Sequence, residues 1–158
     1  MSRREHVAGK HGQILARSVL SGMGFQMIEE IGTPMRLIPV KSLRSNVYQV
    51  IFGEKVAGDH RALLPNGRSV LIEVKTIYER NLVWSDLREH QPAKLSEHDL
   101  WGGLSLLVWV HDSGVYVMMF PVDGFGPGKG ITAVRAAELH EETKRFLAEY
   151  MEGLMEPA

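Results

Sequence analysis

Glu73 and Lys75 place an acid and a base two residues apart inside an apolar segment, residues 69–77. The segment is short and rich in β-branched residues, which predicts a strand with both faces largely covered. Alternate side chains of a strand share a face, so Glu73 and Lys75 lie on the same side. A carboxylate and an ammonium on a buried face are costly unless each is paired or binds a ligand. The pair therefore indicates a functional site, or a salt bridge at a sheet edge that contributes about 0–1 kcal/mol.

Another acidic residue, Asp59, lies 14 residues before Glu73, and the turn between them decides which residues face each other. A two-residue loop would place Asp59 opposite Val74, whose side chain points to the other face. A three-residue loop over residues 65–67 fits better, because its proline suits the second position of a type I turn and its glycine a left-handed bulge. Paired residue numbers then sum to 132. Asp59 is predicted to lie opposite Glu73, on the face of Lys75.

This arrangement has the chemistry of a metal-dependent phosphodiesterase. Asp59 and Glu73, with a backbone carbonyl near Val74, offer the oxygen ligands that Mg²⁺ prefers. Mg²⁺ polarises a phosphate and lowers the pKa of a bound water, and Mn²⁺ is expected to substitute for it. Lys75 is expected to hold the attacking water and to stabilise the negative charge that develops on the phosphate.

The composition allows a folded enzyme and excludes thiol chemistry. The chain has 158 residues, which predicts a single domain, 1–158, with a buried core. The absence of cysteine excludes disulfides, thiol catalysis and Cys-type zinc sites, and it fits a cytoplasmic protein. No apolar stretch of membrane-spanning length and no signal peptide are recognisable, so no membrane association is expected.

The net charge is −1, but the charges are unevenly distributed along the chain. Residues 1–50 carry seven Lys and Arg against three Asp and Glu, a balance of +4. Residues 51–100 carry seven against eight, and residues 101–158 carry four against eight, giving −1 and −4. A basic front end could bind phosphates locally, and a chance distribution remains an equal alternative.

Periodicity and turn residues predict a mixed sheet flanked by helices, a fold of the α/β class. An irregular basic segment at about 33–50 separates the first strand from the others. A glycine-rich loop, residues 123–130, lacks the pattern of a phosphate-binding loop and is interpreted as a connection. Helices are expected at residues 3–22, 92–100 and 132–152, and strands at residues 25–31, 56–64, 69–77, 104–111 and 115–120.

The motifs in this order resemble the PD-(D/E)xK nuclease superfamily, and within it most closely the RecU-type Holliday junction resolvases. The similarity runs from about Gly32 to Val110. It consists of Gly32-Thr33-Pro34, Ile38-Pro39-Val40-Lys41, Gly58-Asp59, Glu73-Val74-Lys75-Thr76, Leu87-Arg88-Glu89-His90-Gln91 and Leu106-Leu107-Val108-Trp109-Val110.

The resemblance implies a restriction-endonuclease-like fold and a Mg²⁺-dependent endonuclease that acts on DNA, in particular on four-way junctions. It implies a homodimer, because two symmetric cuts need two sites related by a two-fold axis. The expected catalytic residues are Asp59, Glu73, Lys75 and Gln91, with Asp59, Glu73 and Val74 as the metal ligands. The expected DNA contacts are Arg36, Lys41 and Arg44.

Three points stay open at this level. Gln91 could orient the attacking water or contact a phosphate, or it could only cap a helix, and the basic residues of 33–50 could be a solvated loop. Gln13 stands where such nucleases often carry a first-helix Glu, and an amide cannot neutralise a cation. The chain could therefore be another PD-(D/E)xK nuclease, restriction-like or nicking, or a DNA-binding module of this fold that does not cut.

Overall fold

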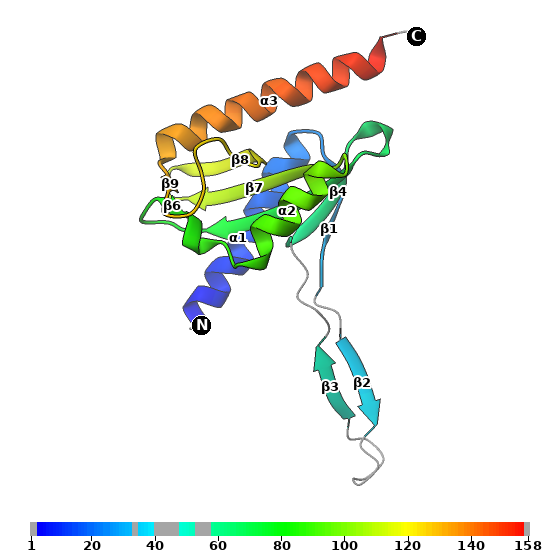
Figure 1. Ribbon diagram of the computed structural model, residues 1–158, viewed down its shortest axis with the longest axis vertical. Helices are drawn as coiled ribbons and strands as arrows, with labels where there is room; N and C mark the ends of the chain where they lie inside the picture. Colours follow the sequence, from blue (N-terminus) through cyan, green and yellow to red (C-terminus); the bar gives the residue numbers. More distant parts are fainter. Residues whose placement is uncertain (1–2, 33–34, 40–47, 53–57, 157–158) are drawn as a thin grey trace.

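The computed structural model describes residues 3–32, 35–39, 48–52 and 58–156 of the chain (Figure 1). The helices are α1 (Arg3–Gly22), α2 (His90–Leu100) and α3 (Ala133–Met155), with short 3₁₀ turns η1 (Pro65–Gly67) and η2 (Trp84–Asp86). The strands are β1 (Gln26–Glu30), β2 (Met35–Pro39), β3 (Tyr48–Phe52), β4 (His60–Leu63), β5 (Ser69–Thr76), β6 (Leu82–Val83), β7 (Leu104–His111), β8 (Gly114–Phe120) and β9 (Gly130–Ile131).

Five of these strands form the central sheet, in the order β1-β4-β5-β7-β8. β5 and β7 run parallel and are joined through α2, whereas every other neighbouring pair is antiparallel. Parallel strands need such a crossover because a tight turn cannot join them. The predicted mixed sheet with flanking helices is confirmed.

The two faces of the sheet carry separate apolar cores. α1 lies on one face, where Ala16 and Leu20 pack against Ile72 of β5 and other even-numbered residues. α2 lies on the opposite face, where Leu95 packs with Leu107 of β7. Figure 1 shows α1 behind the sheet, α2 in front of it and α3 alongside β8. β5 is therefore covered on both sides, as its run of apolar residues predicts.

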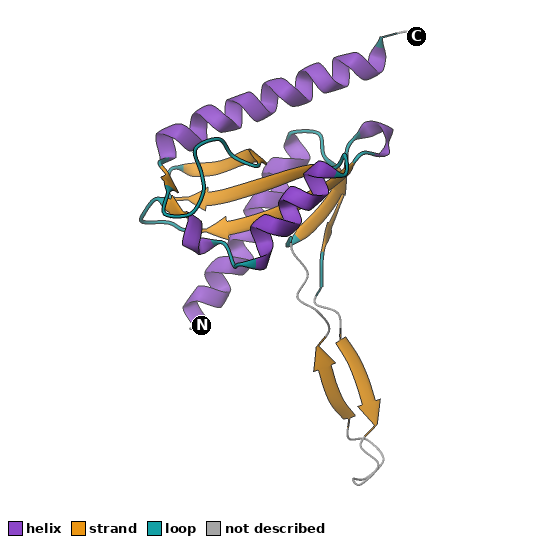
Figure 2. Cartoon of the chain, viewed as in Figure 1, coloured by secondary structure: helices purple, strands orange, loops and turns teal. Residues whose placement is uncertain are grey.

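The segment predicted to be irregular, residues 33–50, instead contains strand structure. β2 and β3 pair antiparallel from Met35–Phe52 to Pro39–Tyr48. Figure 2 shows them as a two-stranded ribbon that projects away from the central sheet. Prolines at both ends of β2 misled the prediction, because proline terminates most strands but is tolerated where one edge is unpaired.

The expected helix and strand boundaries otherwise hold to within a few residues. Thr132, the first residue of the helix expected at 132–152, is the N-cap of α3, since its side chain accepts a hydrogen bond from the backbone of Arg135 (3.2 Å). β4 begins at His60, and the earlier part of its predicted range, 56–57, lies outside the described residues. Within the ranges that the structure covers, none of the helices is long and apolar enough to cross a membrane.

Candidate active site

The β4–β5 hairpin has the predicted register. His60 pairs with Ile72 and Leu63 with Ser69, so paired numbers sum to 132. The predicted turn type is wrong. Asn66 adopts φ 78° and ψ 5°, which is the third residue of a type II turn rather than a type I turn. Gly67 is left-handed as predicted (φ 78°), so the three-residue loop and its register are unchanged.

Asp59 occupies the point where β4 leaves the sheet. Its backbone N–H donates to Ile72 (2.8 Å), and its carbonyl accepts from Ile31 (2.8 Å). Its side-chain Oδ2 then accepts the backbone N–H of Val74 (2.8 Å). The regular pairing of β4 with β5 thus ends at His60 and Ile72, and the Asp59 side chain takes the place of the next backbone partner by accepting from Val74.

Gly58, the residue before Asp59, contacts the side chain of Glu73. Its N–H donates to Oε2 of Glu73 (3.1 Å), and its φ of +88° is a conformation that side chains rarely tolerate. A Cβ atom at this position would also lie 2.6 Å from Cδ1 of Leu71. Glycine is thus required for the chain to bring a backbone donor to Glu73.

Glu73 is the centre of the site. It is 2% exposed, and it lies on the α2 side of the sheet. Its Oε1 accepts from Nε2 of Gln91 and lies 3.2 Å from Nζ of Lys75. Burial raises the pKa of Glu73 to about 7, with further repulsion from Asp59, against the attraction of Lys75. A carboxyl group must lose its proton before it can bind a metal ion, so metal binding would oppose this rise.

Lys75 and Gln91 complete the cluster. Nζ of Lys75 donates to Oε1 of Gln91 (2.9 Å), and its side chain is 15% exposed. Oε1 of Gln91 also accepts the backbone N–H of Arg88 (2.8 Å), in the turn before α2. Gln91 therefore joins Lys75 to Glu73 and ties both to the turn before α2. Its part in orienting a water molecule or contacting a phosphate stays a prediction.

The oxygen atoms of this cluster fit a Mg²⁺ ion that binds the protein through a small number of ligands. Asp59 and Glu73 offer carboxylate oxygens, and the carbonyl of Val74 points the same way as that of Ile72, beyond the last β4–β5 pair. Among the described residues, no group of three or more His, Cys, Asp or Glu is placed to hold a metal ion. Mg²⁺ commonly binds through one or two carboxylates and keeps several waters, so the set is sufficient for it.

Helix α1 approaches the end of β5 at Gly12. A Cβ atom there would lie 2.0 Å from Oγ1 of Thr76, so only glycine permits this contact. Gln13 follows in the sequence and is half-buried. In the described part of the chain, the hydrogen bonds of Glu73 come from Gly58 and Gln91, and Gln13 is not among its partners.

Three further residues were predicted to contact DNA. Arg36 lies on β2, whereas Lys41 and Arg44 lie outside the described residues. His60 points to the α1 side and is buried, as the alternation of β4 predicts. Burial lowers the pKa of His60, against the attraction of Asp59.

Sequence reasoning missed one charged pair beside the site. Arg80 and Asp86 form an ion pair at 2.6 Å in the connection between β5 and α2. The sequence could have indicated this pair, because Arg80 lies five residues after Lys75 and Asp86 lies five residues before Gln91.

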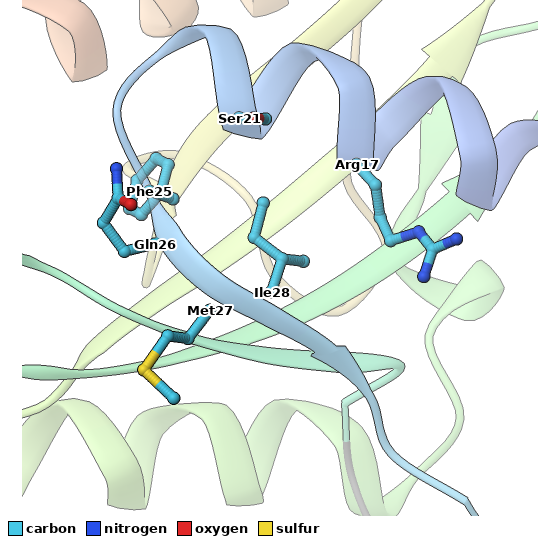
Figure 3. Close-up of a pocket in the computed structure, with 6 residues that line it drawn as sticks. All are labelled: Arg17, Ser21, Phe25, Gln26, Met27 and Ile28. Carbon is cyan, nitrogen blue, oxygen red and sulfur yellow. The ribbon is translucent and has the colours of Figure 1, made fainter.

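The site is distinct from the open pocket between α1 and β1. That pocket has a volume of about 330 Å³ and opens on the edge of the sheet (Figure 3). It is lined by Arg17, Ser21, Phe25, Gln26, Met27 and Ile28. None of the predicted catalytic residues contributes to it.

Comparison with known proteins identifies the fold class. The central mixed sheet and its flanking helices form a restriction-endonuclease-like fold. A similar solved structure is Hjc from Archaeoglobus fulgidus, a Holliday junction resolvase from an archaeal hyperthermophile. The likeness covers 84% of this chain and 99% of that chain, with a TM-score of 0.50 and 16% sequence identity. No protein-family model matches the sequence, and no curated protein matches it. The similarity supports the fold, whereas the narrower resemblance to RecU-type resolvases stays a prediction.

Proposed function

We propose that this chain is a Mg²⁺-dependent endonuclease that hydrolyses phosphodiester bonds in branched DNA, with four-way junctions as its preferred substrate. The observation that carries the proposal is the convergence of Asp59, Lys75 and Gln91 on the buried carboxyl group of Glu73. Perturbed titratable groups that share hydrogen bonds are typical of catalytic sites. The fold of a Holliday junction resolvase, which this chain resembles, adds support for the substrate.

Mg²⁺ bound by Asp59, Glu73 and the carbonyl of Val74 would polarise the scissile phosphate and lower the pKa of a water molecule. Lys75 has a different task, because an ammonium has donors and no lone pair for a metal. Its Nζ is held by Glu73 and Gln91 while part of the side chain stays exposed. From there it donates to the attacking water and stabilises the negative charge that develops on the phosphate.

Gln91 acts as a positioning residue in this proposal. Its Oε1 holds Lys75 and its Nε2 holds Glu73, so the acid and the base keep a fixed separation. The bond from Arg88 ties this amide to the start of α2. Groups held by such outer partners keep the geometry that the reaction needs.

We propose further that the enzyme acts as a homodimer and that the β2–β3 hairpin contacts DNA. A two-fold dimer presents two sites related by the operator that relates the two cuts of a junction. The hairpin projects from the body of the molecule, and Arg36 lies on it (Figure 2). Arg36, Lys41 and Arg44 are the residues proposed to bind phosphates there.

One observation favours a second function. Gln13 stands at the expected first-helix acid position, and among the described residues the site offers the carboxylates of Asp59 and Glu73 without a third acid. A DNA-binding module of the same fold that does not cut would need no further acid.

The test is to incubate the pure protein with labelled four-way junction, linear duplex and single-stranded DNA of matched sequence, with Mg²⁺ or with chelator. The proposal predicts paired, symmetric nicks in the junction that require Mg²⁺. Equal cutting of linear duplex would indicate a general nuclease, and binding without cutting in Mg²⁺ or Mn²⁺ would indicate the non-catalytic module.

A further inference from the structure

The connection between β5 and α2, residues 77–89, begins and ends at the candidate active site. Lys75 lies just before it and Gln91 just after it, and the two side chains share a hydrogen bond of 2.9 Å. In Figure 1 this connection, with β6, lies at the end of the sheet where β5 finishes and α2 starts. A cation on this connection is therefore a candidate contact for DNA that occupies the site.

Arg80 is such a cation, and Asp86 orients it. Nη1 donates to Oδ2 of Asp86 (2.8 Å) and to the carbonyl of Asn81 (3.0 Å), and Nη2 donates to Oδ1 of Asp86 (2.6 Å). Asp86 is itself held by the backbone N–H of Val83 (2.9 Å). The side chain of Asp86 is 12% exposed and that of Arg80 is 54% exposed, so the acid lies inside and the guanidinium outside.

The unused edge of this guanidinium matches a phosphate. An arginine has five N–H donors in a planar fork, and the three bonds described here use both hydrogens of Nη1 and one of Nη2. The two donors left, on Nε and Nη2, lie side by side and have no partner among the described residues. Parallel N–H donors of this kind bind two oxygens of one phosphate.

The connection is anchored, so Arg80 is presented on a fixed support. Leu82 pairs with Ile131, and the backbone N–H of Trp84 donates to Lys129 (2.9 Å). The Trp84 ring packs edge-on against Phe125, with centroids 5.2 Å apart. The pKa of Asp86 is lowered chiefly by the hydrogen bond from Arg80, and attraction from Lys75 adds to this effect.

We propose that Arg80 is a phosphate-binding residue that holds a DNA phosphodiester next to the one at Lys75. This inference rests on the proposed function, since it assumes that DNA occupies the site. The partly buried Asp86 fixes the direction of the guanidinium, which lowers the entropy lost when the phosphate binds. Lysine would not replace it, because an ammonium lacks the planar fork.

The experiment measures DNA binding by fluorescence anisotropy in chelator, over a range of salt concentrations, with labelled four-way junction DNA. Arg80→Gln should lower affinity about 5- to 10-fold at low salt. It should also reduce the slope of log affinity against log salt by about one, because one phosphate contact is lost. Arg135→Gln is the matched control, since Arg135 is an exposed, ion-paired arginine on α3 and should change neither quantity.

Asp86→Asn separates a phosphate contact from a purely structural ion pair. The variant breaks the pair but keeps the cation, so its salt slope should equal that of the wild type even if its melting temperature falls as much as that of Arg80→Gln. Equal losses of salt slope in both variants, or wild-type binding by Arg80→Gln, would overturn the inference and leave the proposed function standing. If the wild-type protein binds no DNA, the inference and the proposed function fail together.

Discussion

Replacing Glu73 by glutamine should make the metal-free protein more stable at pH 8 while abolishing its response to Mg²⁺. Burial raises the pKa of Glu73 from 4.5 to about 7. Because the folded protein holds this proton more tightly than the unfolded chain, the stabilisation is present below pH 4.5 and is lost as the pH rises towards 7. At pH 8 the wild type must keep a buried anion, and the glutamine variant does not.

The magnitude follows from the size of the shift. A difference of 7 − 4.5 = 2.5 units at about 1.4 kcal/mol per unit gives an upper limit of about 3.4 kcal/mol at pH 8. Part of this is already lost at pH 5, so the change between pH 5 and pH 8 is about 2.5 kcal/mol. The glutamine amide cannot accept from Gly58 and Gln91 on both of its atoms, which costs about 1–2 kcal/mol at either pH. Subtracting this cost from the upper limit leaves a net gain of up to about 1.4–2.4 kcal/mol at pH 8.

The assay is denaturant unfolding in chelator at pH 5 and pH 8, for the wild type, Glu73→Gln and the control Glu97→Gln. Glu97 is an exposed acid on α2 that pairs with Lys94. Subtracting the wild type removes the contributions of histidines whose pKa is lowered by burial, such as His60 and His98. With Mg²⁺ added, only proteins with an intact site should gain stability, because a ligand of the folded state stabilises it. If the free energies of unfolding of wild type and Glu73→Gln differ by the same amount at pH 5 and at pH 8, the raised pKa of Glu73 is refuted.

Three further predictions follow from the packing and the proposed assembly. Gln91→Ala should lower the cleavage rate about 10-fold or more, with DNA affinity within a few-fold of wild type. The control Gln26→Ala, on β1, should change neither quantity. Equal losses of rate and affinity in Gln91→Ala would contradict a positioning role. Gly12→Ala should lower the free energy of unfolding by about 1–3 kcal/mol, because its Cβ would meet Thr76. Gly9→Ala is the control, because it lies on the same helix and its Cβ would have nothing within 4 Å; it should raise the free energy of unfolding by about 0.5–1 kcal/mol. A similar effect of both changes in unfolding experiments would refute the close contact. Light scattering at micromolar concentration should give about twice the chain mass of 17.7 kDa, and a monomer that still cuts junctions symmetrically would contradict the dimer.

The sequence predicted the part of the site that depends on local geometry. Turn length fixes the register of a hairpin, so the loop at 65–67 was enough to predict the pairing from Leu63–Ser69 to His60–Ile72, which brings Asp59 to the end of the ladder next to Glu73. The turn type itself was wrong, because Asn66 tolerates a left-handed conformation that the pattern assigned to Gly67 alone. The error had no effect on the register, since both turns span the same three residues.

Contacts between distant elements were harder to predict. The β2–β3 pairing was missed because Pro39 lies in the strand, and proline is tolerated in a strand that pairs, among the described residues, with β3 alone. Arg80 and Asp86 were missed because their contact depends on how the connection folds back between β5 and α2. The two roles of Gln91 follow from the approach of α2 to β5, and no spacing in the sequence specifies that approach.

The most direct test of the central claim is single-turnover cleavage of a labelled four-way junction by wild type and Lys75→Ala, in Mg²⁺ and in chelator. Lys144→Ala is the control, because Lys144 is an exposed lysine that pairs with Glu141 on α3. We predict a loss of about 10²–10³-fold in rate for Lys75→Ala, with affinities for Mg²⁺ and DNA within a few-fold of wild type and Lys144→Ala fully active. Wild-type cleavage by a folded Lys75→Ala variant, or cleavage that persists in chelator, would contradict the assignment of this cluster as a metal-dependent nuclease site.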